Sequence, residues 1–451
     1  MKTLVLVLFL LLLPAFLYAQ QGVNGIPGLS LVAPLKVSAG SDNHFLVDRT
    51  PPTERLFLLS LPPSVQLLAP AAAPQRLNDN VMMLTVPKLA FQNYGPRHEL
   101  TITYVPEIEM FRQNSDLNTW NHDAGFAFGY HLSRRFKVSV GDSFVTSSDP
   151  ASTLQNVFLL LPRSNYRANA FRGELDFQAS GTTAFEFRYD KTRATYGQKT
   201  DPFQTSPLDS IGQGVSLGMT RMLSRTQRLR ARVSLYRFEP INQGDSPDRV
   251  IRRYSVPLTR AVDLQYRIRV NPTTYLNFSG GATAAARGLT YTLGAGADRR
   301  IGSLWVGGGF ARYLAFTALG PTLFANGLNP SGFYDALYLT AREELTPRTV
   351  LQFRATAARS SNDGFIVGTR SLMGSGRFDY RLSDRTVWFA TFETFQQNKN
   401  EVVRSALSRN RFMVGIEFSF SGERDRRTNR LNEDGRNVPL TDHSSRRDTS
   451  Q

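Results

Sequence analysis

Hydrophobic and polar residues alternate one by one over most of the chain. In segment 125–132, Phe126, Phe128 and Tyr130 fall on one face, and glycine, alanine and histidine fall on the other. Successive side chains of a β-strand point to opposite faces, so a period of two predicts strands with one apolar and one polar face. Roughly sixteen such segments lie between residues 98 and 421, and few windows favour a helix.

Short and long connectors alternate between these segments. Turns such as 133–135 and 180–182 are brief, whereas links such as 146–168 and 239–256 are long. A tight turn between two alternating segments is typical of a β-hairpin. The alternation therefore predicts antiparallel strands in chain order, with the short turns at one end and most long loops at the other.

Two kinds of fold can use such a meander: a soluble propeller or a transmembrane barrel. The segments are ten or more residues long, which suits a tilted strand crossing a membrane at about 9 to 11 residues better than a soluble strand of about five or six. One face carries Arg, Asp, Glu and Gln in series, and a water-filled lumen would solvate that face. We therefore predict an all-β fold, a transmembrane antiparallel up-and-down β-barrel of about 16 to 18 strands.

The last predicted strand contains the sequence MVGIEFSF, with Gly415, Phe418 and Phe420. With these residues and the alternating segments, the chain resembles bacterial outer-membrane β-barrels of the porin type. The resemblance implies that these three residues form an assembly signal read by the barrel assembly machinery. It also implies a location in a Gram-negative outer membrane. The family usually ends at the final aromatic residue, whereas this chain continues to Gln451.

The two ends of the chain differ from the alternating region. Residues 1–19 have Lys2 before an apolar core, which is typical of a secretory signal peptide. Residues 20–97 are rich in proline and predict a periplasmic lead-in or a lumen plug, within which 82–92 could add a first barrel strand. The barrel is predicted at 98–421. The polar segment 422–451 predicts a disordered periplasmic tail, so both termini are expected in the periplasm.

The chain has no cysteine and carries 53 Lys+Arg against 37 Asp+Glu, a formal net charge of +16. A basic excess can indicate nucleic-acid binding, but the export signal makes that partner unexpected. The polar faces near the short turns predict a basic ring in the lumen: Arg228, Arg230, Arg232, Arg267, Arg269, Arg377 and Arg381. They also predict an acidic sector: Glu174, Asp176, Glu186 and Asp190.

A basic ring in a low-dielectric wall attracts anions, which predicts a channel that passes anionic solutes or exports an acidic polysaccharide. The alternative is a plugged barrel that anchors or assembles another envelope component, in which Arg and acid pairs only knit the wall together. Outer-membrane lipid and lipopolysaccharide are further expected partners.

His122 and Asp123 are adjacent, so on one straight strand they point to opposite faces and form no catalytic dyad. We expect no enzyme activity, no cofactor and no metal site.

Overall fold

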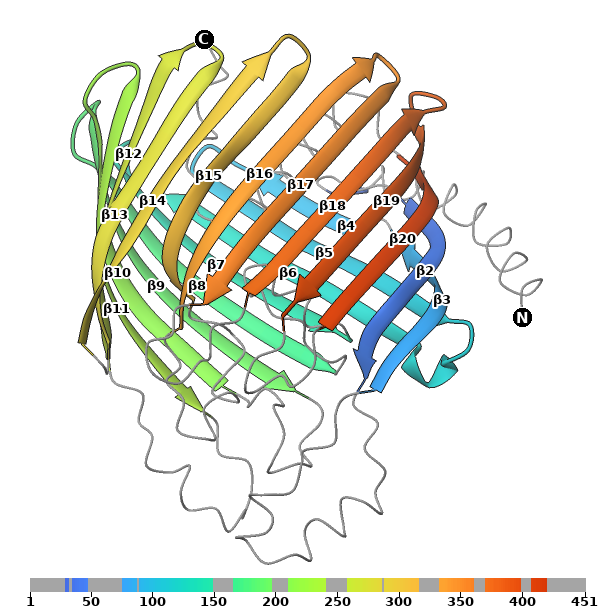
Figure 1. Cartoon of the computed structure of the whole chain (residues 1–451). Helices are drawn as coiled ribbons and strands as arrows, with labels where there is room; N and C mark the ends of the chain where they lie inside the picture. The colour runs from blue at the N-terminus through green and yellow to red at the C-terminus, as the bar shows by residue number, and fades with distance from the viewer. Residues whose placement is uncertain are drawn as a thin grey trace, which may run out of the picture.

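We describe a computed structural model of the chain. It covers residues 29–31, 35–47, 75–86, 89–148, 165–196, 210–240, 258–285, 288–315, 332–360, 370–398 and 407–419. These residues form one antiparallel sheet that closes on itself into a barrel (Figure 1). The predicted signal peptide at 1–19, the predicted tail at 422–451 and Phe420 lie outside the described residues.

The first half of the sheet consists of β1 (Leu29–Leu31), β2 (Leu35–Val47), β3 (Gln75–Thr85), β4 (Leu89–Tyr94), β5 (His98–Phe111), β6 (Thr119–His131), β7 (Phe136–Ser147), β8 (Tyr166–Gln178), β9 (Thr183–Tyr196) and β10 (Ser210–Met222). The second half consists of β11 (Gln227–Pro240), β12 (Thr259–Asn271), β13 (Thr274–Ala285), β14 (Gly288–Ile301), β15 (Leu304–Ala315), β16 (Gly332–Thr346), β17 (Thr349–Ser360), β18 (Arg370–Arg381), β19 (Thr386–Gln397) and β20 (Leu407–Phe418). A short 3-10 helix, Ser115–Leu117, lies between β5 and β6.

The sheet has 20 strand segments but 18 positions in the barrel wall. β3 and β4 both pair with β5 and so share one position, while β1 pairs with β4 and β2 pairs with β3. From β5 onward each strand pairs with the next, and β20 pairs with β2 to close the barrel. The predicted fold class is confirmed, with 18 strands from the predicted range.

The predicted start of the barrel at residue 98 is wrong. Residues 35–47, 75–85 and 89–94 were expected in a lead-in or plug, and they form wall strands instead. The strand suggested at 82–92 is divided between β3 and β4. The physical reason is that β20 and β5 would otherwise expose unpaired backbone amides to lipid, where no water can satisfy them.

Serine residues form several of the tight turns at one end of the barrel, the upper end in Figure 1. The side-chain oxygens of Ser133, Ser180, Ser224 and Ser383 each accept a hydrogen bond from the backbone amide two residues later, at 3.2 or 3.3 Å. A turn that is stabilised by a hydrogen bond between its own serine side chain and its own backbone needs no tertiary contact. These turns are therefore specified locally, and they lie where the sequence predicted them.

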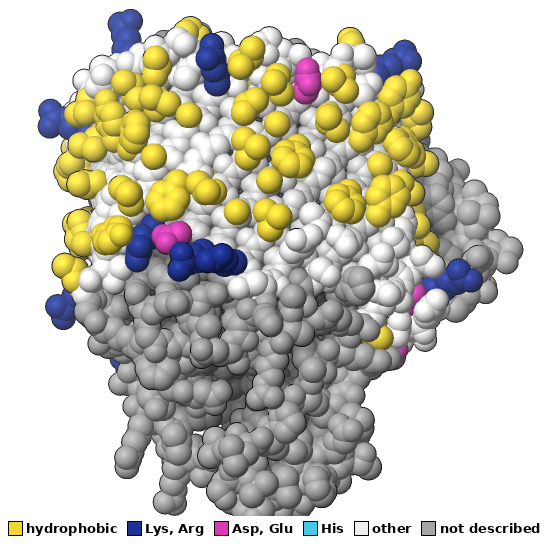
Figure 2. Space-filling view, viewed as in Figure 1, with side chains coloured by type: hydrophobic (Ala, Val, Ile, Leu, Met, Phe, Trp, Pro, Cys, Tyr) yellow, Lys and Arg dark blue, Asp and Glu magenta, His cyan; other side chains and the backbone are white. Residues whose placement is uncertain are grey.

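The two faces of the wall differ sharply. Large apolar side chains cover the outer face; for example, the exposed fraction is 58% at Leu217, 51% at Leu264 and 60% at Leu337. Figure 2 shows these side chains as a broad band with charged residues at its margins. An apolar surface of this extent needs a nonaqueous environment, which a lipid bilayer supplies to a closed barrel. None of the helices in the described part of the chain is long and apolar enough to cross a membrane.

Candidate functional site

The inner face of the wall carries many charged side chains. Strand register assigns to it the carboxylates of Asp42, Asp79, Glu99, Glu107, Glu109, Asp123, Glu174, Asp176, Glu186, Asp190, Asp263, Asp298, Glu344, Asp379, Glu393 and Glu417. The inner cationic residues are Lys36, Lys137, Arg172, Arg188, Arg228, Arg230, Arg232, Arg267, Arg269, Arg300, Arg342, Arg354, Arg377, Arg381, Arg409 and Arg411. Within the described strands the two sets are equal in number, so the basic excess of the chain does not come from this face.

The two signs of charge are unevenly distributed around the lumen of the described barrel. Carboxylates outnumber cationic groups on β2 to β9, and arginines outnumber carboxylates on β11 to β20. The predicted acidic sector, on β8 and β9, belongs to the acidic half. The predicted arginines, on β11, β12 and β18, belong to the basic half. Sequence analysis missed Arg300 and Arg342, which are inward on β14 and β16 between these groups.

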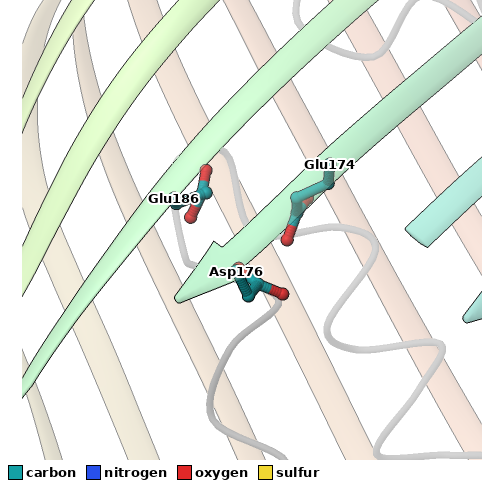
Figure 3. Close-up of side chains that lie close together, drawn as sticks. All are labelled: Glu174, Asp176 and Glu186. Carbon is teal, nitrogen blue, oxygen red and sulfur yellow. The ribbon is translucent and has the colours of Figure 1, made fainter. Parts of the chain in front are cut away.

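Three of the predicted acidic residues form a compact acidic cluster. Glu174 and Asp176 project from β8 and Glu186 from β9, and their carboxylates lie close together (Figure 3). One oxygen of each lies within 4.8 Å of the others. This spacing would suit a cation, because like charges so close repel each other.

Two arginines on β11 already neutralise part of the acidic cluster. Arg230 Nη2 lies 2.7 Å from Glu186 Oε2, and Arg232 Nη2 lies 3.4 Å from Glu186 Oε1. Both cross β10, where the intervening inward residue is Gly218. The small residue leaves room for the long side chains to reach over it. These contacts support the expectation that some arginine and acid pairs brace the wall.

The fourth predicted acid, Asp190, binds two arginines in the next layer of the wall. Its carboxylate accepts hydrogen bonds from Arg188 Nε at 2.6 Å and from Arg188 Nη2 at 2.9 Å. Arg172 Nε on β8 donates to the same group at 3.1 Å. Asp190 is therefore a bridging group between β8 and β9 and does not join the acidic cluster.

The arginines nearest the short turns are arranged differently. Arg228 on β11 is directly opposite Arg267 on β12. The guanidinium carbon of Arg267 lies 4.8 Å from the centre of the Tyr275 ring, and Tyr275 is opposite Arg269. Two like charges face each other across one strand pair, which costs free energy unless anions or carboxylates compensate it. We call Arg228, Arg267 and Arg269 the mouth arginines.

The predicted arginines on β18 belong to a second group of ion pairs. Arg377 Nε lies 2.8 Å from Asp379 Oδ1, and Arg377 Nη2 lies 2.9 Å from Glu417 Oε2 across β19. Its guanidinium also stacks on Phe389, 4.8 Å from the ring centre. Arg381 also lies inward, four residues after Arg377 and next to the turn, opposite Val387. Arg377 therefore ties the last strands together as well as contributing charge to the lumen.

Sequence analysis did not find the most buried charged group of the wall. Asp42 on β2 is 0% exposed and receives Arg409 Nη2 at 2.6 Å. Arg411 Nε lies 3.9 Å from the same carboxylate, and Arg411 Nη2 lies 3.0 Å from Glu109 on β5. We call these four residues the seam network, because they connect β20 to β2 and, across β3, to β5. Asp42 is a single acidic residue in a segment with weak alternation of apolar and polar residues, so the sequence pattern did not predict this network.

The two described residues of the expected assembly signal, Gly415 and Phe418, lie on different faces. Gly415 is inward, and Phe418 is on the outer parity of β20, opposite Leu35. A Cβ atom at Gly415 would collide with the carbonyl oxygen of Val37 and would lie 2.7 Å from the Phe389 ring. Gly415 thus has a packing role in closing the barrel, and recognition by assembly machinery stays a prediction.

His122 and Asp123 point to opposite faces, as the sequence predicted. His122 is outward, and its Nδ1 lies 2.9 Å from the hydroxyl of Tyr104. The neighbouring Trp120 is 66% exposed on the same face. These aromatic residues suit the boundary between lipid and water, where amphipathic rings are favoured.

No family model matches the chain, and no curated protein matches it. Among solved structures, it is similar to OccAB4 of Acinetobacter baumannii at 9% identity and a TM-score of 0.43, covering 85% of this chain and 97% of that one. It is similar to OpdQ of Pseudomonas aeruginosa at 8% identity and a TM-score of 0.43, covering 86% and 98%. It is also similar to the siderophore receptor PirA of Pseudomonas aeruginosa at 10% identity and a TM-score of 0.37, covering 86% and 80%. Identities this low say nothing about which solutes the chain handles.

Proposed function

We propose that the protein is an outer-membrane channel through which small hydrophilic solutes diffuse. The wall has 18 positions, and barrels of 16 to 18 strands are wide enough to hold an aqueous passage. The outer face is apolar over a broad band, and the inner face is charged. Lipid outside and water inside are the two solvents that this distribution requires.

The observation that carries the proposal is the separation of charge across the lumen. Carboxylates dominate on β2 to β9 and arginines on β11 to β20. Charged groups at this density need water as well as each other, because burying them in a dry interior would cost several kcal/mol per ion. An aqueous passage between the two halves supplies that water and exposes a field that acts on charged and dipolar solutes.

Anion preference is the finer part of the proposal. The described strands carry equal numbers of opposite charges on their inner face, so the overall ion selectivity of the lumen is expected to be weak. The mouth arginines Arg228, Arg267 and Arg269 lie next to the short turns, which makes that entrance the site of any anion enrichment. An acidic polymer that enters from this end would contact the same mouth arginines. The proposal gives no residue a catalytic role.

We assign the short-turn end of the barrel to the periplasm, since barrels of this type have short periplasmic turns and longer external loops. Leu35 begins β2 and is opposite Phe418, the last residue of β20. Both ends of the wall therefore lie at the short-turn end, and the flanking segments would start from the periplasmic side.

The competing function is a plugged barrel that anchors another envelope component. It was based on residues 20–97 as a candidate plug. Three portions of that segment, 35–47, 75–85 and 89–94, are wall strands, which weakens this alternative.

Solute uptake tests the proposed function. Liposomes that contain the purified protein and are loaded with an impermeant polymer should swell in isotonic solutions of small uncharged sugars. The rate should fall as the sugar becomes larger, because passage is limited by the width of the lumen. Liposomes that swell no faster than protein-free liposomes would contradict an open channel.

A further inference from the structure

A row of charged residues crosses four neighbouring strands on the outer face. Arg312 on β15 is directly opposite Asp335 on β16, Asp335 is opposite Arg359 on β17, and Arg359 is opposite Arg370 on β18. All four occupy the alternate strand positions whose side chains point outward, as the apolar outer residues do. We call them the outer arginine row. It lies at the ends of these strands that are farthest from the short turns.

The outer arginine row borders the apolar band. Leu337 on β16 and Leu372 on β18 follow two positions closer to the short turns, with exposed fractions of 60% and 48%. Figure 2 shows basic side chains beside an acidic one at the lower edge of the band. If the band lies in hydrocarbon, the row lies at the depth of the lipid headgroups.

The row has an excess of positive charge. Arg312 Nη1 lies 3.8 Å from Asp335 Oδ1, and its guanidinium carbon lies 4.4 Å from the centre of the Tyr291 ring. Asp335 is the single carboxylate among three arginines. Arg359 and Arg370 are both exposed and directly opposite each other. Like charges in this arrangement destabilise a strand pair, and an anion bound between them would remove that cost.

Other outward basic residues extend the same margin around the barrel. They are Arg167, Lys191, Arg193, Arg237 and Arg260, all exposed and all in the half of their strands away from the short turns. The row on β15 to β18 is its most compact part.

We infer that the outer arginine row binds the phosphate groups of an anionic glycolipid in the membrane leaflet next to the long loops. Guanidinium groups match phosphate oxygens bidentately, and a phosphate between Arg359 and Arg370 would contact both. Position at the edge of the apolar band favours a lipid headgroup over a soluble anion, because the acyl chains can pack on Leu337 and Leu372 at the same time. The inference rests on the membrane orientation in the proposed function.

Binding of diphosphorylated lipid A to the full-length protein tests the inference. The protein in detergent would be titrated with lipid A, and bound lipid would be counted by native mass spectrometry. The test variant is Arg359→Ser with Arg370→Ser. The matched control is Arg221→Ser with Arg299→Ser, which removes two exposed outward arginines near the short turns. Dephosphorylated lipid A and inorganic phosphate are the control ligands.

We expect the test variant to bind lipid A about tenfold more weakly and the control variant to bind it like the unchanged protein. Dephosphorylated lipid A and inorganic phosphate should bind weakly to all three proteins. Equal affinity in the test variant, or an equal loss in both variants, would overturn the inference. Tight binding of inorganic phosphate alone would also overturn it, by identifying a soluble anion as the ligand.

Two additions keep the test decisive. If the serine variant does not fold, Arg359→Lys with Arg370→Lys keeps the charge, and it should retain part of the affinity because lysine lacks the bidentate geometry. Full affinity or complete loss in that variant would contradict recognition of phosphate by guanidinium groups. Conductance measured in parallel separates the two proposals, since these residues face away from the lumen: an open channel without lipid A binding would refute only this inference.

Discussion

Asp42 and Arg409 are 367 positions apart in the sequence, and their side chains make a bidentate ion pair at 2.9 and 2.6 Å. Asp42 is on β2 and Arg409 is on β20, the two strands that close the barrel. Paired guanidinium and carboxylate groups fix both distance and orientation. The pair therefore defines the register in which the first and last strands meet.

Removal of the buried carboxylate should destabilise the barrel. Asp42→Ala leaves Arg409 and Arg411, each 12% exposed, without their shared anion. Breaking a buried pair from one side costs about 3 to 5 kcal/mol. We expect the midpoint of denaturant unfolding to fall accordingly in detergent micelles. Lys36→Gln is the control: Lys36 Nζ is 4.0 Å from Glu417 Oε2 and the Lys36 side chain is 26% exposed, so about 1 kcal/mol or less should be lost. Equal stability of the two variants would show that the seam network is dispensable.

Truncation should reveal the role of the first wall strands. A chain that starts at residue 98 lacks β2, β3 and β4, so β20 and β5 would have unpaired edges. We expect it to fail to refold, as seen by loss of the strand signal in circular dichroism and of heat-modifiable migration in gels. A chain that starts at residue 20 should refold normally. Refolding of the shorter chain into a stable barrel would contradict the assigned closure.

Glycine at position 415 should be required for closure. A methyl group there meets the backbone carbonyl of Val37, which cannot rotate away as a side chain can. Gly415→Ala should therefore lower stability by about 1 to 3 kcal/mol, as overpacking does. Gly376→Ala on β18 is the matched control, because a Cβ atom there meets nothing within 4 Å. A purely recognition-based role would instead leave refolding in vitro unchanged and reduce assembly in cells.

Ion selectivity should respond in opposite directions to changes in the two halves of the lumen. Arg228→Ser with Arg267→Ser removes two mouth arginines and should shift the reversal potential in a salt gradient toward cations. Glu174→Gln with Asp176→Asn should shift it toward anions. We expect changes of about twofold in the permeability ratio, equivalent to about 0.4 kcal/mol. No shift in either variant would mean that these groups only brace the wall.

Alternation predicted the later strands well because each of them buries one face in lipid. In 262–270, for example, the outward residues Val262 and Leu264 have exposed fractions of 48% and 51% and give a clear period of two. The outward positions of β2 carry the apolar residues Leu35, Val37 and Ala39 and then the polar residues Ser41 and Asn43, so the apolar face covers only the first part of the strand. Its pattern is too weak to predict a strand. Pairing with β20, which sequence periodicity does not record, places it in the wall.

The candidate site was predictable as a set of faces but not as a set of contacts. The alternation of side chains along each strand predicted that Arg230, Arg232 and Glu186 point inward. Their pairing, however, depends on the register of β9, β10 and β11 together. The seam network depends on the closure of the whole barrel. Sequence gave no reason to connect Glu109 with Arg411, which are 302 positions apart. Charge separation across the lumen emerges only when every strand has its position.

Single-channel recording of the purified, refolded full-length protein in a planar bilayer tests the central claim most directly. We predict steady, ohmic steps of current, with weak ion selectivity because inward carboxylates and inward basic residues are equal in number on the described strands. The reversal potential in a salt gradient would then be small. Intact, folded barrels that insert into the bilayer and carry no current would contradict a channel and favour a plugged barrel.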